Sequence, residues 1–339
     1  MPGVRLNFNK DSIGMSFGVT GARYTINSKG RRTVSAGFPG TGLYNVEVLS
    51  GGRSSRSKRS QQTYEETPTP SRSGPPAPGF FAGAAERALN KFMLDVYHVE
   101  HPDTAKEIIE KATALRAQYP MLSPVLECTA FLHAILDKET EAKARTWGQA
   151  IWDARETIFS DKFVVKYLDG ITPATQITRG ISTNLKYNKQ LFSFIWVEVL
   201  QDQKKYTEAL EVLNQMQPDQ MVAISIADIE NTMGDYDAAI ETTEDIENED
   251  DATAMLLVLR GIAFREKKLN DAALECFKRA LANKKRSEGL LHRALFERAE
   301  TYARMNKKAM AIKDLERILV DEPAYEEVEE KLAKLQGMK

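Results

Sequence analysis

The sequence predicts a mainly α-helical protein, in which a superhelix of helical hairpins follows a small antiparallel β-meander domain and a disordered linker. Three observations lead to this prediction. Small and aromatic residues recur with helical spacing between residues 191 and 323. Side chains alternate with a period of two in residues 1–50. Between the two parts lies a stretch in which Ser, Pro and Gly dominate.

The clearest helical hairpin lies between Gly261 and Ala280. Ala273, Phe277 and Ala280 are three and four residues apart, so they share one face of a helix. Gly261 and Phe264 fall on the helix before it. Because two antiparallel helices approach closely only where small residues meet, we expect these small residues to form the contact and the aromatic residues to fill the space beside it.

The alanine near the start of the second helix recurs along the chain. Ala209, Ala239, Ala273 and Ala311 follow one another at intervals of 30, 34 and 38 residues. This spacing resembles the tetratricopeptide repeat (TPR), whose period is about 34 residues. The four imperfect copies agree in phase, which favours a TPR-like superhelix over a helical bundle with chance alanine spacing. The other residues at matching places are Leu213, Pro218, Ala227, Gly234, Ala299, Tyr302, Leu315 and Pro323.

Three positions depart from the TPR pattern. Arg260 and Arg298 stand where the first helix of a repeat usually carries Leu. Thr243 stands at the place that Phe277 takes in the next copy.

The TPR resemblance implies that the first helix of each hairpin lines a concave groove for a partner. Carried over by position, the expected groove residues are Phe194, Glu198, Asp228, Asn231, Arg265, Glu300 and Arg304. This mixed, mildly acidic set suits a peptide or protein with basic and apolar character. The Lys and Asn set by which some family members clamp a peptide carboxylate is absent. Ordinary solvated surface is the alternative for each of these residues.

We expect four parts along the chain. They are a glycine-rich β domain at 1–50, a flexible linker at 51–79, degenerate helical hairpins at 80–188 and TPR-like repeats at 189–339. Residues 167–188 contain Gly170, Pro173 and Gly180 and lack a helical period, which predicts an extended or hairpin-like insertion. Both recognition of a partner and a long connection packed on the array remain open for it.

The N-terminal region resembles a known family. PGVRLNF, GARYTI, GRRT and FPGTGL occur in this order over residues 2–49 and are similar to a bacterial domain of unknown function, number 4236 in that series. The resemblance implies a fold and a bacterial origin, without an activity. In that family a basic strand precedes the first segment, so we expect a truncated start or a sheet that is one strand short. A sheet of this size needs cover for its apolar face, which predicts self-association.

Positive charge gathers near the N-terminus. Residues 1–60 hold ten basic and two acidic side chains, a net charge of +8 in a chain whose formal total is −2. Such a segment attracts a polyanion, for example a nucleic acid. The expected contacts come from Arg31, Arg32, Arg53, Arg56, Lys58 and Arg59. A solubilising tether is the alternative for the linker.

No catalytic, cofactor or metal motif assembles in the sequence. The segment GFPGTG has neither the glycine order of a dinucleotide fingerprint nor the Lys-Ser/Thr of a P-loop, so it predicts a tight turn. His98 and His101 precede a proline and lack the further ligands of a zinc set. Cys128 and Cys276 fall in helical apolar patterns and are expected to be buried reduced thiols.

These observations predict a non-catalytic protein–protein interaction scaffold whose groove binds a partner protein or peptide. The alternative is a nucleic-acid-associated adaptor that uses the basic N-terminal domain and linker. An enzyme stays a third hypothesis, because residues far apart in sequence can assemble a site. No signal-peptide pattern opens the chain, and the most apolar window, LFSFIWVEVL, is about half the length that spans a bilayer. We therefore expect a cytoplasmic protein without membrane contact.

Overall fold

The computed structural model describes residues 75–96, 103–135, 139–169, 174–322, 325 and 328–337, and the backbone of five strands nearer the N-terminus. The strands are β1 (Gly3–Asn9), β2 (Ser12–Val19), β3 (Ala22–Asn27), β4 (Arg32–Gly37) and β5 (Tyr44–Ser50). Each pairs antiparallel with the next, in the order of the sequence. The register pairs Leu6 with Met15 and Phe17 with Tyr24, so residues of the alternating pattern face each other across the strands.

The chain divides into two compact units. The first contains Met1–Thr175 and Asn184–Val199, and the second contains Gln176–Thr183 and Leu200–Lys339. The helices of the first unit are α1 (Ala84–Val96), α2 (Ala105–Gln118), α3 (Ser123–Ala134), α4 (Glu141–Asp153) and α5 (Lys162–Leu168), with the 3-10 turns Pro120–Leu122 and Ile158–Ser160. Most of α6 (Lys189–Asp202) belongs to it as well.

Local signals in the sequence set the helix ends of the first unit. Thr104 and Glu107 form a reciprocal capping box at the start of α2, which satisfies two backbone N–H groups that have no partner within the helix. The carboxylate of Asp161 accepts from the first N–H groups of α5. The core contains the rings of Phe131, Phe192 and Trp196, all fully buried.

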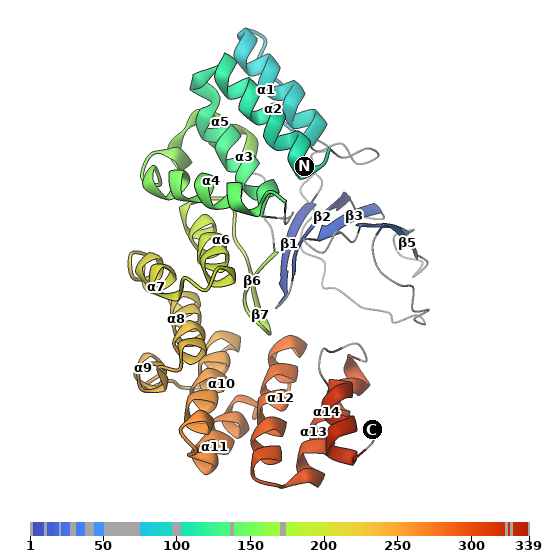
Figure 1. The fold of residues 1–339 in the computed structure, drawn as a ribbon, viewed down its shortest axis with the longest axis vertical. Helices are drawn as coiled ribbons and strands as arrows, with labels where there is room; N and C mark the ends of the chain where they lie inside the picture. The colour runs from blue at the N-terminus through green and yellow to red at the C-terminus, as the bar shows by residue number, and fades with distance from the viewer. Residues whose placement is uncertain are drawn as a thin grey trace. The chain divides into compact units, whose positions relative to one another are not determined.

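The second unit is a succession of helices in which each packs against the next (Figure 1). They are α7 (Tyr206–Asn214), α8 (Gln220–Met233), α9 (Tyr236–Thr242), α10 (Asp251–Glu266), α11 (Asn270–Ala280), α12 (Glu288–Arg304), α13 (Lys308–Asp321) and α14 (Val328–Gln336). In addition, α10 packs on both α8 and α12, so the first helices of successive hairpins lie side by side. Strands β6 (Ala174–Thr178) and β7 (Ile181–Asn184) form a separate two-stranded sheet.

Alanine-sized residues form the contact between paired helices, as the sequence predicts. Ala209, Ala239, Ala273 and Ala311 are all 0 % exposed. A Cβ atom added to Gly261 would come within 2.6 Å of the Phe277 ring, closer than real Cβ atoms approach their neighbours. The ring therefore fills the space that a larger residue at position 261 would take.

A left-handed residue ends the first helix of each repeat. Lys204, Gly234, Lys268 and Asn306 have φ angles of 60°, 82°, 64° and 59°, and each lies five residues before one of the four alanines. The next residue in each copy donates its N–H to the carbonyl five residues back along the helix, which is the Schellman pattern of hydrogen bonds. The sequence pattern groups Gly234 with the small residues of the interhelical contact. In the structure, Gly234 lies outside that contact and ends α8. The residue 34 positions before Gly261 is Ala227, and it is buried.

The residues that depart from the TPR pattern have polar partners within the array. The Arg260 guanidinium donates to the carbonyl of Thr243 over 2.9 Å, at the end of α9. Arg298 makes a two-pronged contact with the carboxylate of Asp314, both distances being 2.7 Å. The Thr243 hydroxyl donates to the carbonyl of Ala239 over 2.6 Å, which satisfies the polar group in a buried position. Pro323, the last expected match, lies outside the described residues.

The positive φ angle of Gly234 predicts a measurable strain when this glycine gains a side chain. Gly234→Ala is expected to lower the free energy of unfolding by about 1 kcal/mol, because a Cβ disfavours left-handed backbone. Chemical denaturation followed by circular dichroism measures the change.

Gly83→Ala is the matched control for this substitution. A Cβ at Gly83 meets nothing within 4 Å and its φ angle is not in the left-handed region, so the variant should unfold like the wild type. Equal stability of the two variants would contradict the assignment of Gly234 as the helix-closing residue.

Candidate polar face for partner binding

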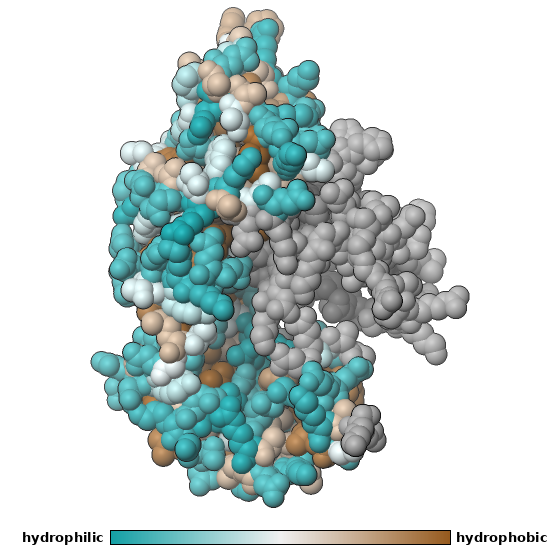
Figure 2. Space-filling model, in the orientation of Figure 1, coloured by the Kyte–Doolittle hydropathy of each residue, from teal (hydrophilic) through white to brown (hydrophobic). Residues whose placement is uncertain are grey.

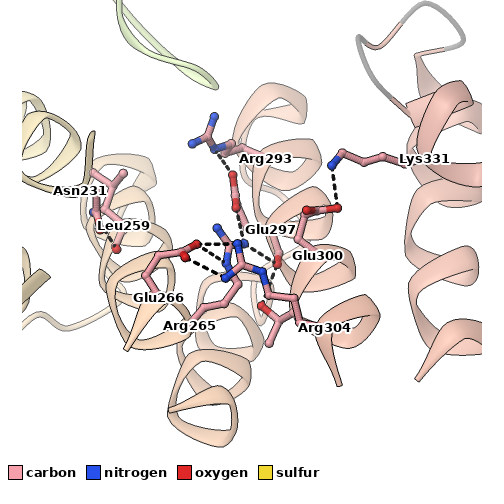
Figure 3. A network of polar contacts seen from close by, with 10 residues as sticks. Asn231, Leu259, Arg265, Glu266, Arg293, Glu297, Glu300, Arg304 and Lys331 are labelled. Carbon is pink, nitrogen blue, oxygen red and sulfur yellow. Dashed lines mark hydrogen bonds and ion pairs between the residues drawn. The ribbon is translucent and has the colours of Figure 1, made fainter. Parts of the chain in front are cut away.

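Polar and charged side chains from the first helices of successive hairpins meet on one face of the second unit. We call it the polar face. Its residues come from α8, α10 and α12. They are Asp228 and, as Figure 3 shows, Asn231, Arg265, Glu266, Arg293, Glu297, Glu300 and Arg304.

A buried ion pair lies at the centre of the polar face. Nη1 of Arg265 on α10 lies 2.6 Å from Oε2 of Glu297 on α12, and the two side chains are 7 % and 6 % exposed. The other carboxylate oxygen of Glu297 lies 2.9 Å from Nε of Arg293 (Figure 3). Burial alone would raise the pKa of the Glu297 carboxyl, but Arg293 and Arg265 beside it bring the pKa below its ordinary value. Glu297 is therefore held as a carboxylate between two guanidinium groups.

Further polar contacts tie neighbouring repeats together around this pair. Arg304 reaches back to α10 and holds both carboxylate oxygens of Glu266 at 2.8 Å. Lys331 of α14 lies 2.8 Å from the carboxylate of Glu300. The amide of Asn231 donates to the carbonyl of Leu259 over 3.1 Å, which joins α8 to α10. The polar face thus combines structural contacts with side chains that remain partly accessible.

The tip of the β6–β7 hairpin contacts the polar face. The hydroxyl of Thr178 donates to Oδ2 of Asp228 over 2.8 Å. Burial raises the pKa of the Asp228 carboxyl, against the opposing effects of Arg293 and of the Thr178 hydrogen bond. At Gly180, whose φ angle is 97°, an added Cβ would lie 2.7 Å from the carbonyl oxygen of Gly289 in the first turn of α12. The backbones of the tip and of α12 are therefore close at a pair of glycines.

Arg179 lies against two neighbouring aromatic rings. Its guanidinium carbon is 5.0 Å from the ring centre of Phe296 and 4.3 Å from that of Tyr325. These two rings are themselves 5.8 Å apart. The charge of Arg179 also contributes to the lowered pKa of Glu297. The tip thus presents a cation to an aromatic and acidic environment.

The structure separates the seven expected groove residues into two groups. Asp228, Asn231, Arg265, Glu300 and Arg304 all lie on the polar face. That a partner contacts them stays a prediction. Arg265 is buried and pairs with both Glu297 and Glu266, so it can act on a partner only through these carboxylates.

Phe194 and Glu198 belong to the first unit. Phe194 is 2 % exposed, which corrects the expectation that it faces a groove. Its position in the apolar run of α6 places it in the core, where a large ring gains most from burial. Glu198 is half-buried on the same helix.

Sequence reasoning missed Glu297 and Arg293, whereas it did predict an extended or hairpin-like insertion at residues 167–188, where β6 and β7 lie. The i, i+4 spacing of Arg293 and Glu297 is a signal that could have found this pair on one helix face. The expected polyanion contacts Arg31, Arg53, Arg56, Lys58 and Arg59 lie outside the described residues, as does the side chain of Arg32. His98 and His101 lie outside them too.

The remaining chemistry of the described residues is sparse. Cys128 and Cys276 are free and buried, as the sequence predicts, and burial raises the pKa of the Cys128 thiol to about 12. The described part of the chain holds no group of three or more His, Cys, Asp or Glu side chains placed to bind a metal ion. Of the helices that the structure describes, none has the length and apolar character needed to cross a membrane. On the face drawn in Figure 2, hydrophobic residues form small separate patches among hydrophilic ones.

Comparisons with known proteins agree with the repeat geometry. Residues 1–46 match a family model described as protein of unknown function (DUF4236). No curated protein matches the chain in sequence. The crystal structure of the N-terminal domain of the EccA1 ATPase, from the ESX-1 secretion system of Mycobacterium tuberculosis, is similar with a TM-score of 0.56 and 14 % identity. That match covers 74 % of this chain and 90 % of the EccA1 chain.

A second solved structure, the APC/C hetero-tetramer Cut9–Hcn1, matches with a TM-score of 0.36 and 13 % identity, over 74 % of this chain and 48 % of that chain. The recurring helix closures and the EccA1 likeness show that the protein has a mainly helical fold of repeated hairpins, which resembles TPR structures. It carries a DUF4236 segment at its N-terminus. The predicted TPR-like fold is thereby confirmed.

The central ion pair makes a clear prediction about stability. Glu297→Gln removes the carboxylate that lies between the buried Arg265 and the partly buried Arg293, and it is expected to lower the free energy of unfolding by about 3–5 kcal/mol. Glu275→Gln is the control, because its pair with Lys278 is 59 % and 74 % exposed and its loss should change stability by less than about 0.5 kcal/mol.

The same comparison at several pH values tests the sign of the pKa change. Because the pKa of Glu297 is lower in the folded state, its stabilising contribution is present above the ordinary value of 4.5 and is lost as the pH falls below it. The stability gap between wild type and Glu297→Gln should therefore narrow in acid. A gap that widens as the pH falls would contradict this account.

Proposed function

We propose that the protein is a non-catalytic scaffold whose polar face binds a partner protein or peptide. The observation that carries this proposal is the row of polar side chains that α8, α10 and α12 present on one side of a repeated array. The TPR-like fold is typically non-catalytic. Stacked repeats create extended surfaces, and such surfaces suit an elongated partner better than a small molecule.

The charges of the polar face indicate the character of the partner. The carboxylates of Asp228, Glu266, Glu297 and Glu300 lie near guanidinium groups that already hold several of them in place. An incoming segment therefore meets a surface that is close to neutral, with local acidic points. A partner segment with basic and apolar side chains fits this surface best, as the sequence pattern also predicts.

The N-terminal strands suggest how the scaffold is extended. We propose that residues 1–50 form a β domain, that residues 51–79 connect it flexibly to the helical part, and that the hairpins of residues 80–188 lengthen the array. The consecutive antiparallel pairing of β1 to β5 supports a meander. Self-association through this sheet would cover the apolar residues of its alternating pattern.

Site-specific photo-crosslinking tests the interaction proposal. A photoreactive phenylalanine analogue at Arg304 or Asn231, in the full chain expressed in its native cell, is expected to capture the same partner from both positions. The control places the analogue at Glu275 on α11, which lies on a second helix of a hairpin. A partner captured equally from Glu275, or none from the polar face, would count against the proposal.

The net charge of +8 in residues 1–60 supports a second candidate, a nucleic-acid-associated adaptor. Binding of the full chain to DNA or RNA should then fall steeply with salt, because counterions are released. Replacing Arg53, Arg56, Lys58 and Arg59 by Gln should reduce the slope of log K against log salt by up to about 4. A mobility-shift assay at several salt concentrations measures both. If the full chain binds neither nucleic acid at low salt, this candidate is removed.

A further inference from the structure

The residues that hold the hairpin tip have the chemistry of a binding site. Thr178, Arg179 and Gly180 are consecutive, and each makes its own contact with a different feature of the second unit. Thr178 donates to a carboxylate on α8, Arg179 lies over two aromatic rings, and Gly180 lies on the first turn of α12.

We propose that Phe296 and Tyr325, with the Glu297 carboxylate nearby, form an arginine-recognition site that the chain's own Arg179 fills and for which a partner's arginine competes. The proposal rests on the proposed scaffold function and names the chemistry of its partner. That chemistry is an arginine preceded by a hydroxyl-bearing residue and followed by glycine, in an extended or turn conformation.

The connectivity of the tip supports competition with a separate chain. Residues Gln176–Thr183 belong to the second unit, whereas the residues directly before and after them, Thr175 and Asn184, belong to the first. The second unit therefore holds the tip by non-covalent contacts alone, as it would hold a segment of another protein. The buried side chains of Ile177 and Ile181 add apolar contacts to the polar ones.

The aromatic and charged surroundings favour arginine over lysine. A planar guanidinium can stack on a ring and still donate at its edge, whereas an ammonium group is a strongly hydrated point charge. The ammonium group of Lys331, which lies 5.1 Å from the ring centre of Phe296, is paired with Glu300 and bounds the site on that side. The Tyr325 hydroxyl is buried and has no hydrogen-bond partner among the described residues, so it offers an acceptor or donor to a bound segment.

The glycine pair limits what can follow the arginine. An added Cβ at Gly180 would lie 2.7 Å from the Gly289 carbonyl oxygen, and an added Cβ at Gly289 would lie 3.3 Å from the Gly180 carbonyl oxygen. Position 180 has no room for a side chain in the present arrangement, and position 289 is tight. A competing segment therefore needs glycine, or a gap in its side chains, at the residue after its arginine.

A peptide in trans tests the proposal. The probe is a fluorescein-labelled, capped peptide with the sequence of residues 174–184, ATQITRGISTN. Its binding by fluorescence anisotropy is compared for the full wild-type chain and for the Arg179→Ala variant, which removes the internal arginine and so weakens the hold on the tip. If the tip fills the wild-type site nine-tenths of the time or more, removal should tighten peptide binding about tenfold or more.

Two controls, one in the peptide and one in the chain, distinguish specific recognition of arginine from nonspecific peptide binding. A peptide that carries the Arg179→Lys change should bind the Arg179→Ala chain at least about tenfold more weakly than the original peptide does, because lysine stacks poorly on the two rings. The chain variant Arg179→Ala/Tyr325→Leu should return to weak binding of the original peptide. Binding that ignores either change overturns the proposal.

A second variant keeps the test decisive if Arg179→Ala does not fold. Gly180→Ala should push the tip away from Gly289 and raise peptide affinity in the same direction. Gly234→Ala is its matched control, since that glycine also has a left-handed φ angle, but an added Cβ there meets nothing closer than 3.9 Å. If neither Arg179→Ala nor Gly180→Ala binds the peptide more tightly than the wild type and Gly234→Ala do, the site does not exist.

Failure of this proposal is distinct from failure of the scaffold function. Crosslinking from Arg304 and Asn231 reports a partner whether or not arginine is its anchor. A partner captured there together with no peptide binding would overturn the arginine site and leave the scaffold. Loss of both results would overturn both.

Discussion

The close approach of paired helices at alanine-sized residues is the constraint on which the rest of the second unit depends. Each of the four alanines is fully buried, and at Gly261 even a methyl group would overlap the facing Phe277 ring. When helices pack this closely, their first members are also brought side by side, and polar residues on α8, α10 and α12 can reach one another. The Arg265–Glu297 pair and the Arg304–Glu266 pair are consequences of this spacing.

The buried ion pair then sets what the polar face can do. A carboxylate at this depth is stable only with charged partners, and Glu297 has two of them. These partners fix the side chains in place before any ligand arrives, which reduces the entropy lost on binding. The same arrangement leaves little net charge at the centre, so recognition depends on shape, rings and single hydrogen bonds more than on attraction at a distance.

The repeat was predictable from the sequence because its signals are local. Alanines at intervals of 30, 34 and 38 residues gave the phase, and the helices occur where apolar residues have helical spacing. The closing residue of the first helix is indicated by the sequence at Gly234 and more weakly at Asn306, because Gly and Asn favour left-handed backbone, whereas Lys204 and Lys268 carry no such signal. The position of Phe194 was misjudged because a large apolar residue on a first helix can face either a groove or the core.

The contacts of the hairpin tip could not be predicted from local patterns in the sequence. Gly180 and the irregular stretch around it indicate a turn, but only the folded chain brings Thr178 to Asp228, which is 50 residues away. The same holds for Arg260 and Arg298, which stand where the TPR pattern has Leu. The structure explains both departures, because Arg260 donates to the Thr243 carbonyl and Arg298 donates to the Asp314 carboxylate. The chemistry of a site depends on contacts between residues that are distant in sequence. The helical spacing of apolar residues predicts only the helices on which these residues lie.

The constant offset between each left-handed residue and its alanine has a consequence for how such arrays change in length. The reverse turn inside each hairpin is the same in all four copies, five residues from closure to contact. The unequal intervals therefore arise outside this turn, in the lengths of the helices and in the stretches between hairpins, such as residues 281–287 before α12. Residues inserted between hairpins leave the pairing within each hairpin unchanged, whereas a residue added within a hairpin turn would change the pairing of its two helices.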